Sequence, residues 1–148
     1  MKYSSFSAVL FAVVLSGCAD IQVSPDAAPG KNLIPPSFAG NFFTEICLTT
    51  APDFEGVPQA IAGEPFVQHS ETGTYFHQFA DLSIKASERG CSLVFRSEMS
   101  IDETLSELAN GTVKNAANWG VTIPRNIDVI SYPDPDGNGR YFRIGLPR

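Results

Sequence analysis

The chain is poor in positive charge. Its 148 residues include 10 lysines and arginines against 16 aspartates and glutamates, which leaves a formal net charge of −6 at pH 7. Nucleic acids and anionic lipid headgroups are repelled at close range by such a balance. The composition therefore argues against nucleic acid and anionic membrane surfaces as partners, and it is compatible with cations, basic proteins and neutral ligands.

The motifs of several enzyme classes are also missing. The sequence contains no G-x-S-x-G elbow, no S-x-x-K pair, no glycine-rich phosphate loop and no H-E-x-x-H helix. A hydrolytic site would have to be assembled from scattered serines. We therefore expect a non-enzymatic protein without a cofactor, and we assign no catalytic residue.

Long hydrophobic runs are lacking, and the longest apolar stretch, Phe6–Leu15, is broken by Ser7. It is too short to span a bilayer as a stable helix, and it follows a single positive charge at Lys2. This arrangement is typical of a secretory signal peptide, which we assign to residues 1–17.

The signal segment ends at Leu15-Ser16-Gly17-Cys18, where small residues directly precede a cysteine. This tetrapeptide resembles the lipobox of bacterial lipoproteins. The resemblance implies that the Cys18 thiol receives a diacylglyceryl group, that the chain is cut before Cys18 and that the new amine is acylated. Several acyl chains anchor a protein stably. In lipoproteins of enteric type, an aspartate directly after the cysteine favours the inner membrane. Ala19 stands there, so the resemblance implies the periplasmic leaflet of the outer membrane.

Residues 18–37 are rich in small and polar residues and in proline. The prolines are Pro25, Pro29, Pro35 and Pro36. Proline-rich chains are extended spacers. We expect this segment to be a tether between the lipidated cysteine and a single domain over residues 38–148.

Cys47 and Cys91 are the two cysteines that remain once Cys18 is set aside. An exported protein folds in an oxidising compartment, where such a pair is typically bonded. We predict a structural disulfide whose loop of about 45 residues stabilises the fold by roughly 4 kcal/mol. The alternative, a redox-active pair or a metal site, lacks the C-x-x-C spacing.

Apolar residues recur at helical spacing after the tether. They predict a helix over Asn41–Thr50, with its first residue as the N-cap and Cys47 on its inner face. A short second helix over Asp53–Ala62 is predicted less strongly, because Gly56 and Pro58 interrupt it.

The periodicity changes to two between Phe66 and Glu98. It predicts a strand near Thr74–Gln78, followed by a hairpin with its turn at Ser87-Glu88-Arg89-Gly90. Cys91 faces inward on the second hairpin strand, toward the helix that carries the other cysteine.

Ser100-Ile101-Asp102-Glu103 has the capping-box pattern of a helix start, and Gly120 suits a C-terminal cap. Asn110-Gly111 is a weak point that could split the helix. Between the caps, apolar spacing predicts a buried stripe of Ile101, Leu105, Leu108, Thr112, Ala116 and Trp119. We expect Trp119 to lie in the core, against the alternative of a ligand-stacking residue.

Two strand-like runs, Ile127–Tyr132 and Arg140–Leu146, flank a polar turn. Within that turn Asp134, Asp136 and Asn138, followed by glycine, resemble the opening of an EF-hand calcium loop. Glycine also stands at position 145, where the loop's bidentate glutamate belongs, and a plain hairpin turn explains the same residues. Calcium binding over Asp134–Gly139 is therefore an alternative to a simple turn.

His69 and His77 are the only histidines, and Glu71 has the same parity. On one unbroken strand the three side chains would share a face, which would suit a zinc site or a general base. Thr72-Gly73 is expected to interrupt that strand. A metal-dependent or hydrolytic site at these residues is thus an alternative to an ordinary polar surface.

The blocks Phe43–Leu48, His69–His77 and Cys91–Phe95 are similar to segments of small uncharacterised exported bacterial proteins, and no activity comes with that resemblance. We predict an α+β fold with two or three helices packed on one face of a mainly antiparallel sheet of four or five strands. The predicted function is a lipid-anchored periplasmic interaction or accessory module of the cell envelope, with the membrane and an envelope protein as partners. The histidine site and the calcium loop are the alternatives.

Overall fold

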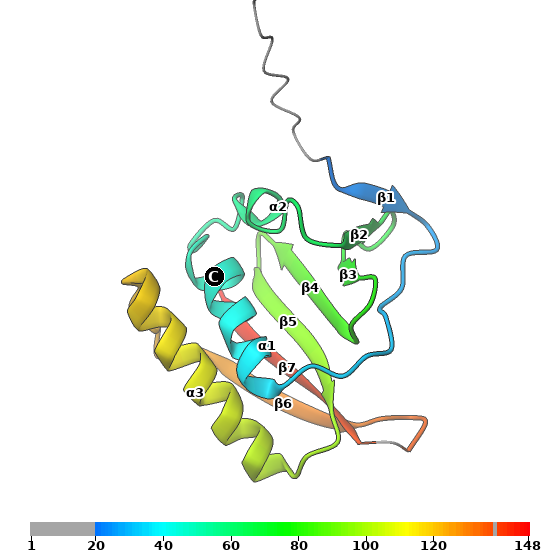
Figure 1. Cartoon of the computed structure of the whole chain (residues 1–148). Helices are drawn as coiled ribbons and strands as arrows, with labels where there is room; N and C mark the ends of the chain where they lie inside the picture. Colours follow the sequence, from blue (N-terminus) through cyan, green and yellow to red (C-terminus); the bar gives the residue numbers. More distant parts are fainter. Residues whose placement is uncertain (1–19, 138) are drawn as a thin grey trace, which may run out of the picture.

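The computed structural model of this protein describes residues 20–137 and 139–148 (Figure 1). They form an α+β fold of three helices, a π-helical turn and one seven-stranded sheet. In chain order the elements are β1 (Gln22–Ser24), α1 (Pro36–Phe43), the π-helical turn η1 (Thr44–Leu48), α2 (Val57–Ala60), β2 (Phe66–His69), β3 (Tyr75–His77), β4 (Leu82–Ser87), β5 (Gly90–Ser97), α3 (Ile101–Trp119), β6 (Asp128–Pro133) and β7 (Arg140–Pro147). None of the helices in this part of the chain is long and apolar enough to cross a bilayer.

The strands lie in the order β1-β2-β3-β4-β5-β7-β6, and only β1 and β2 run parallel. The predicted α+β class and antiparallel pairing are confirmed, but seven strands replace the expected four or five. The two additional strands are β1 and β2, which have 3 and 4 residues. A two-residue period cannot stand out over so short a stretch, so these strands escape a prediction based on periodicity.

The segment expected to be a tether joins the fold at β1. Farther along, the Gly30 N–H donates to the His77 carbonyl (2.8 Å) and the Asn32 N–H to the Phe79 carbonyl (3.1 Å). A Cβ added at Gly30 would lie 2.1 Å from the carbonyl carbon of Phe79, so this close approach requires glycine. Ordered structure therefore begins before the expected boundary at residue 38. Backbone hydrogen bonds, which composition does not reveal, hold the proline-rich chain against the sheet.

The β4–β5 hairpin follows the predicted alternation. Ser87 pairs with Gly90 across the turn, and along β5 the side chains of Cys91, Leu93 and Phe95 are buried. Successive strand side chains point to opposite faces, so these three residues mark the core side of the sheet. The helices lie over this side in Figure 1, with α3 packed beside α1.

The first helix begins earlier than predicted, at Pro36 rather than at Asn41. Proline suits the first helical turn because its φ is already helical and its missing N–H needs no partner there. The helix continues directly into η1, where Cys47 is buried as predicted. The second predicted helix is present as α2 but is only 4 residues long, with Pro58 in its first turn.

Both predicted caps of α3 are confirmed. The Ser100 hydroxyl oxygen accepts from the Glu103 N–H (3.3 Å), and the Glu103 carboxylate accepts from the Ser100 N–H (3.2 Å). At the other end Gly120 adopts a left-handed φ of 66°, which glycine tolerates without strain.

The predicted apolar stripe of α3 is wrong at both ends. Trp119 is 54% exposed and does not lie in the core, and Ile101 and Leu105 are 41% and 37% exposed. The residues of α3 that are buried are Thr104, Leu108, Gly111, Thr112 and Ala116. Small and hydroxyl side chains thus replace large apolar ones along most of the buried side.

The reason is a close crossing of α1 and α3. A Cβ added at Gly111 would lie 2.0 Å from the Ser37 carbonyl oxygen, and one added at Gly40 would lie 2.4 Å from the Leu108 carbonyl oxygen. The Thr44 hydroxyl also donates across the crossing to the Thr112 carbonyl (3.2 Å). Asn110-Gly111, expected to be a weak point, is therefore where the two backbones meet, and α3 is continuous through it.

Candidate functional site

Cys18, the predicted lipidation site, lies outside the described residues. The lipobox therefore stays a prediction from the sequence.

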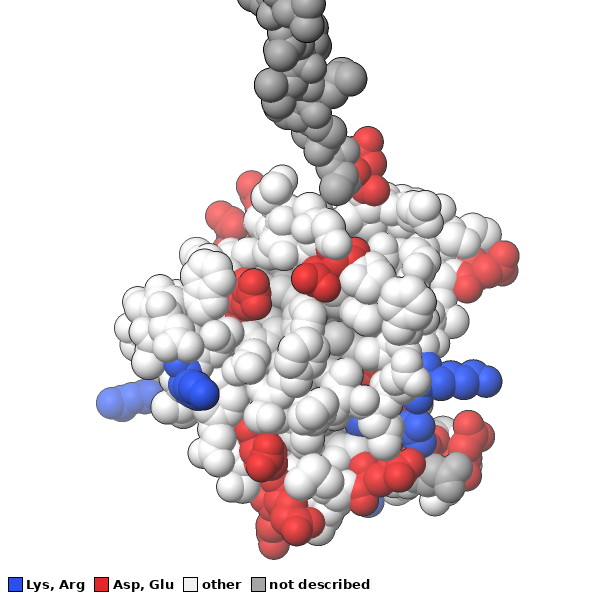
Figure 2. Space-filling model, in the orientation of Figure 1, with Lys and Arg blue, Asp and Glu red and all other residues white. Residues whose placement is uncertain are grey.

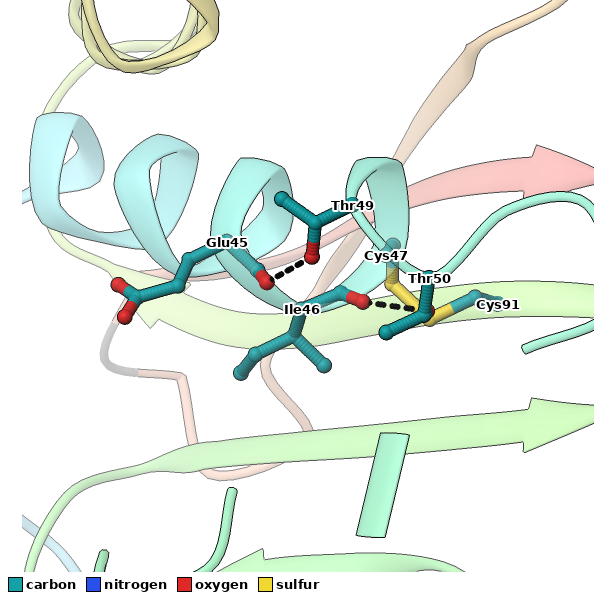
Figure 3. The surroundings of a disulfide bond; sticks show 6 residues. All are labelled: Glu45, Ile46, Cys47, Thr49, Thr50 and Cys91. Carbon is teal, nitrogen blue, oxygen red and sulfur yellow. Dashed lines mark hydrogen bonds between the residues drawn. A yellow bond between two sulfur atoms is a disulfide. The ribbon is translucent and has the colours of Figure 1, made fainter. Parts of the chain in front are cut away.

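The predicted disulfide between Cys47 and Cys91 is present and joins η1 to β5 (Figure 3). The two Cα atoms are 5.5 Å apart, and both side chains are buried in the core. Beside it, the Thr49 and Thr50 hydroxyls donate to the carbonyls of Glu45 and Ile46 at the end of the helix. These bonds satisfy carbonyls that the ending helix leaves without partners, so the surroundings of the disulfide stabilise structure.

The strand is interrupted at Thr72-Gly73 as expected, so the common face of the two histidines and Glu71 that the alternative metal or general-base site requires is not formed. The chain reverses between β2 and β3, where the His69 N–H donates to the Thr74 carbonyl (2.8 Å). Phe66 stands opposite His77, so these two share a face, and His69, three residues after Phe66, points to the other face. The His77 imidazole and the Phe66 ring meet edge to face, with their ring centroids 5.2 Å apart.

Both histidines bind local backbone instead of a common ligand. Nδ1 of His69 accepts from the N–H groups of Glu71 and Thr72 (3.3 and 3.4 Å). Nδ1 of His77 accepts from those of Phe79 and Ala80 (3.3 and 2.9 Å). Burial lowers the pKa of His77 below its usual value, and the charge of Glu64 opposes this shift. Across residues 20–137 and 139–148, no three His, Cys, Asp or Glu side chains gather in a way that could hold a metal ion.

The candidate calcium turn is a hairpin turn between β6 and β7. Asp134 is buried, and its Oδ1 accepts from the Asp136 N–H (3.0 Å), while the Gly137 N–H donates to the Asp134 carbonyl (3.0 Å). Asp136 is exposed, and Asn138 lies outside the described residues. The Asp134 carboxylate thus closes the turn and, through Oδ2, pairs with Arg96 (3.4 Å).

Arg96 forms the centre of a charged cluster that the sequence analysis did not find. Its Nε donates to Asp81 Oδ2 at 2.9 Å, and the Tyr141 hydroxyl donates to the same oxygen at 3.2 Å. Burial opposes the charge of the guanidinium, but the hydrogen bond and charge of Asp81 and the charges of Asp134 and Glu98 outweigh it and raise the pKa of Arg96. Burial, followed by the charge of Asp81, raises the pKa of Tyr141.

This cluster ties together segments that are far apart in sequence. Asp81 precedes β4, Arg96 lies on β5, Asp134 begins the β6–β7 turn and Tyr141 lies on β7. Strand alternation could have indicated that Arg96 and Tyr141 point away from the helices, but their common partner depends on strand register. Because each carboxylate of the cluster already binds Arg96, we interpret the cluster as structural.

The most exposed apolar strand in the described part of the chain is β6, at the edge of the sheet. Its only strand partner there is β7. Val129, Ile130 and Tyr132 are 39%, 47% and 42% exposed, and they point to both faces. The Tyr132 ring stacks on Tyr141 at 5.6 Å, which holds one of these side chains in place. An open edge with apolar neighbours is a template for pairing with another strand.

Charge is distributed unevenly over the molecule. Residues 32–84, which include α1, α2, β2 and β3, contain no lysine or arginine. The helix side accordingly shows mostly uncharged and acidic surface, with few basic side chains (Figure 2).

Comparison of the chain with protein-family models, with curated proteins and with solved structures found no match.

Proposed function

We propose that this chain is a lipid-anchored, non-enzymatic interaction module of the bacterial cell envelope that binds an extended segment of another envelope protein by strand addition at β6. The anchor is the lipid on Cys18, which the lipobox resemblance supports. The domain then faces the periplasm, and the outer membrane is favoured over the inner because Ala19 follows the cysteine.

The proposed interaction is supported chiefly by the open edge of β6. A sheet edge offers a row of backbone donors and acceptors, and soluble proteins usually protect it with charges, bulges or a covering element. On β6 the charge of Asp128 is at one end and Pro133 at the other, and Val129, Ile130 and Tyr132 lie between them. Strand addition would pair the backbone of this stretch and shield its apolar side chains.

The partner segment should be extended, neutral or basic, and apolar at alternate positions. Aromatic and β-branched side chains pair favourably across neighbouring strands, so such residues would suit positions beside Ile130 and Tyr132. A second copy of this chain is less suitable, because two molecules that each carry a net negative charge repel one another.

A synthetic peptide with the sequence of β7, Arg140–Pro147, is a defined probe for this edge. It is basic and extended, and within the protein it already forms the natural cross-strand partner of β6. We expect the peptide, added to the full chain in nonionic detergent micelles, to slow amide hydrogen exchange in β6. Ile130→Lys with Tyr132→Lys should abolish the slowing, because charges at an edge strand oppose pairing.

Val113→Lys on α3 is the matched control, since Val113 is 58% exposed and lies on a different element. This variant should keep the effect of the peptide. Slow exchange in β6 that appears without peptide and grows with protein concentration would identify a second copy as the occupant and contradict the proposal. No change in β6 at millimolar peptide would refute strand addition.

A further inference from the structure

A row of four residues crosses the sheet on the face away from α1. Strand register places Lys85 beside Ser92, Ser92 beside Gly145, and Gly145 beside Asp128. Because Gly145 has no side chain, the sheet is hollowed at this point. The resulting pocket has a volume of about 200 Å³ and is also lined by Arg89 and Arg143.

The acidic member of this row is neutralised within the protein. Asp128 Oδ2 pairs with Arg143 Nη2 at 2.9 Å. A Cβ added at Gly145 would lie 2.7 Å from the other carboxylate oxygen, Oδ1, so the glycine leaves room for this pair. The pair contributes no net charge to the pocket.

Two further cationic side chains, Lys85 and Arg89, line the pocket. Within residues 20–137 and 139–148, neither Lys85 nor Arg89 forms an ion pair. The pocket therefore carries about two uncompensated positive charges on an otherwise acidic protein.

We propose that this pocket binds a phosphoryl group, carried either by a small soluble anion or by a lipid headgroup. Arginine and lysine are the usual donors to phosphate, and such charge-assisted bonds are stronger than neutral ones. Pockets for drug-sized ligands measure about 300–1,000 Å³, so one of about 200 Å³ suits a single charged group. The net negative charge does not prevent this binding, because exposed charges beyond a Debye length of about 8 Å are largely screened at physiological salt.

This site is independent of strand addition at β6, and a direct titration tests it. The full chain in nonionic micelles is titrated separately with inorganic phosphate and with dihexanoyl phosphatidylglycerol below its micelle concentration, while the amide resonances of Ser92 and Gly145 are followed by NMR. We expect saturable shifts at both residues. Lys85→Gln with Arg89→Gln should raise the dissociation constant at least tenfold.

Lys31→Gln with Lys114→Gln is the matched control, because it removes the same charge from residues that do not line the pocket. It should leave the dissociation constant within twofold. Saturation by phosphate identifies a soluble anion as sufficient, and saturation by the lipid alone identifies a headgroup; either result supports the pocket. Equal weakening in both double variants, or no saturable shift with either probe, would overturn the proposal.

Discussion

Two single residues illustrate how a neighbour distant in sequence decides what a side chain does. His77 accepts hydrogen bonds from the N–H groups of Phe79 and Ala80 and packs against Phe66, so its imidazole is a local structural element. Gly111 has the opposite role, because its missing side chain allows α1 to approach α3. A substitution at each of these two residues tests its role.

His77 should make the stability of the protein depend on pH. Burial lowers the pKa of His77 in the folded protein, whereas the unfolded chain protonates near the usual value of about 6.5. Folded protein therefore binds fewer protons, and stability is lost as the pH falls through and below about 6.5. In His77→Asn, where an amide oxygen can replace the Nδ1 acceptor, urea unfolding should show a smaller loss between pH 7.5 and 5.5. Identical losses in the variant and the parent protein would contradict this assignment.

Gly111→Ala should destabilise the protein although alanine is the better helix former. The added methyl would lie 2.0 Å from the Ser37 carbonyl oxygen, a backbone atom that cannot move without shifting α1. Overpacking of this kind costs about 1–3 kcal/mol, more than the gain of about 1 kcal/mol in helix propensity. Urea unfolding measures the difference. Asn110→Ala, at the exposed neighbouring position, should stay within about 0.5 kcal/mol, and equal effects of the two substitutions would argue against the crossing.

Among the elements, η1 and β5 depend most on a covalent link. The disulfide joins residues 44 positions apart and connects the helical layer to the central strands. Helix packing places Cys47 over β5, and strand alternation directs Cys91 toward the same side of the sheet. The two sulfur atoms are therefore close enough to bond.

Removal of this bond by Cys47→Ala with Cys91→Ala should lower the free energy of unfolding by about 4 kcal/mol, because the unfolded chain regains the entropy of an open loop. Denaturant unfolding of the variant and of the parent protein, with and without reductant, provides the measurement. Reductant should weaken the parent protein and leave the variant unchanged. Titration of free thiols at Cys47 and Cys91 in the native oxidised protein would contradict the pairing.

For the whole molecule, the proposed position in the cell depends on lipidation of Cys18, which the lipobox resemblance predicts. Cys18→Ser should leave the precursor unlipidated and uncut by the lipoprotein peptidase, because the thiol that receives the lipid is gone. Mass spectrometry of the mature N-terminus and the amount of protein in the membrane fraction check this outcome. A wild-type N-terminus other than an acylated Cys18, or an unchanged membrane fraction in the variant, would contradict the proposed anchor.

Local signals in the sequence determined much of the architecture. Three features depend only on residues close together in sequence, so they could be predicted without knowledge of the fold. They are the capping box at Ser100, the left-handed glycine after α3 and the alternation along β5. The disulfide was predictable because few cysteines were available to pair. The residues of the calcium-like turn also favour a simple hairpin, and the structure has a hairpin turn there.

The tertiary structure alone decided the features that depend on register and on close approach. Pairing of the chain before α1 with β2, β3 and the loop after β3 turned an expected tether into part of the sheet. The sequence predicts an interruption at Thr72-Gly73, but only the register of β2 and β3 placed His69 and His77 on opposite faces. Apolar spacing correctly placed Leu108, Thr112 and Ala116 on the buried side of α3, but the close contact of Gly111 with α1 depends on the tertiary structure. The open edge of β6 and the pocket around Gly145 follow from strand order and register, because residues far apart in sequence become neighbours only when the strands pair.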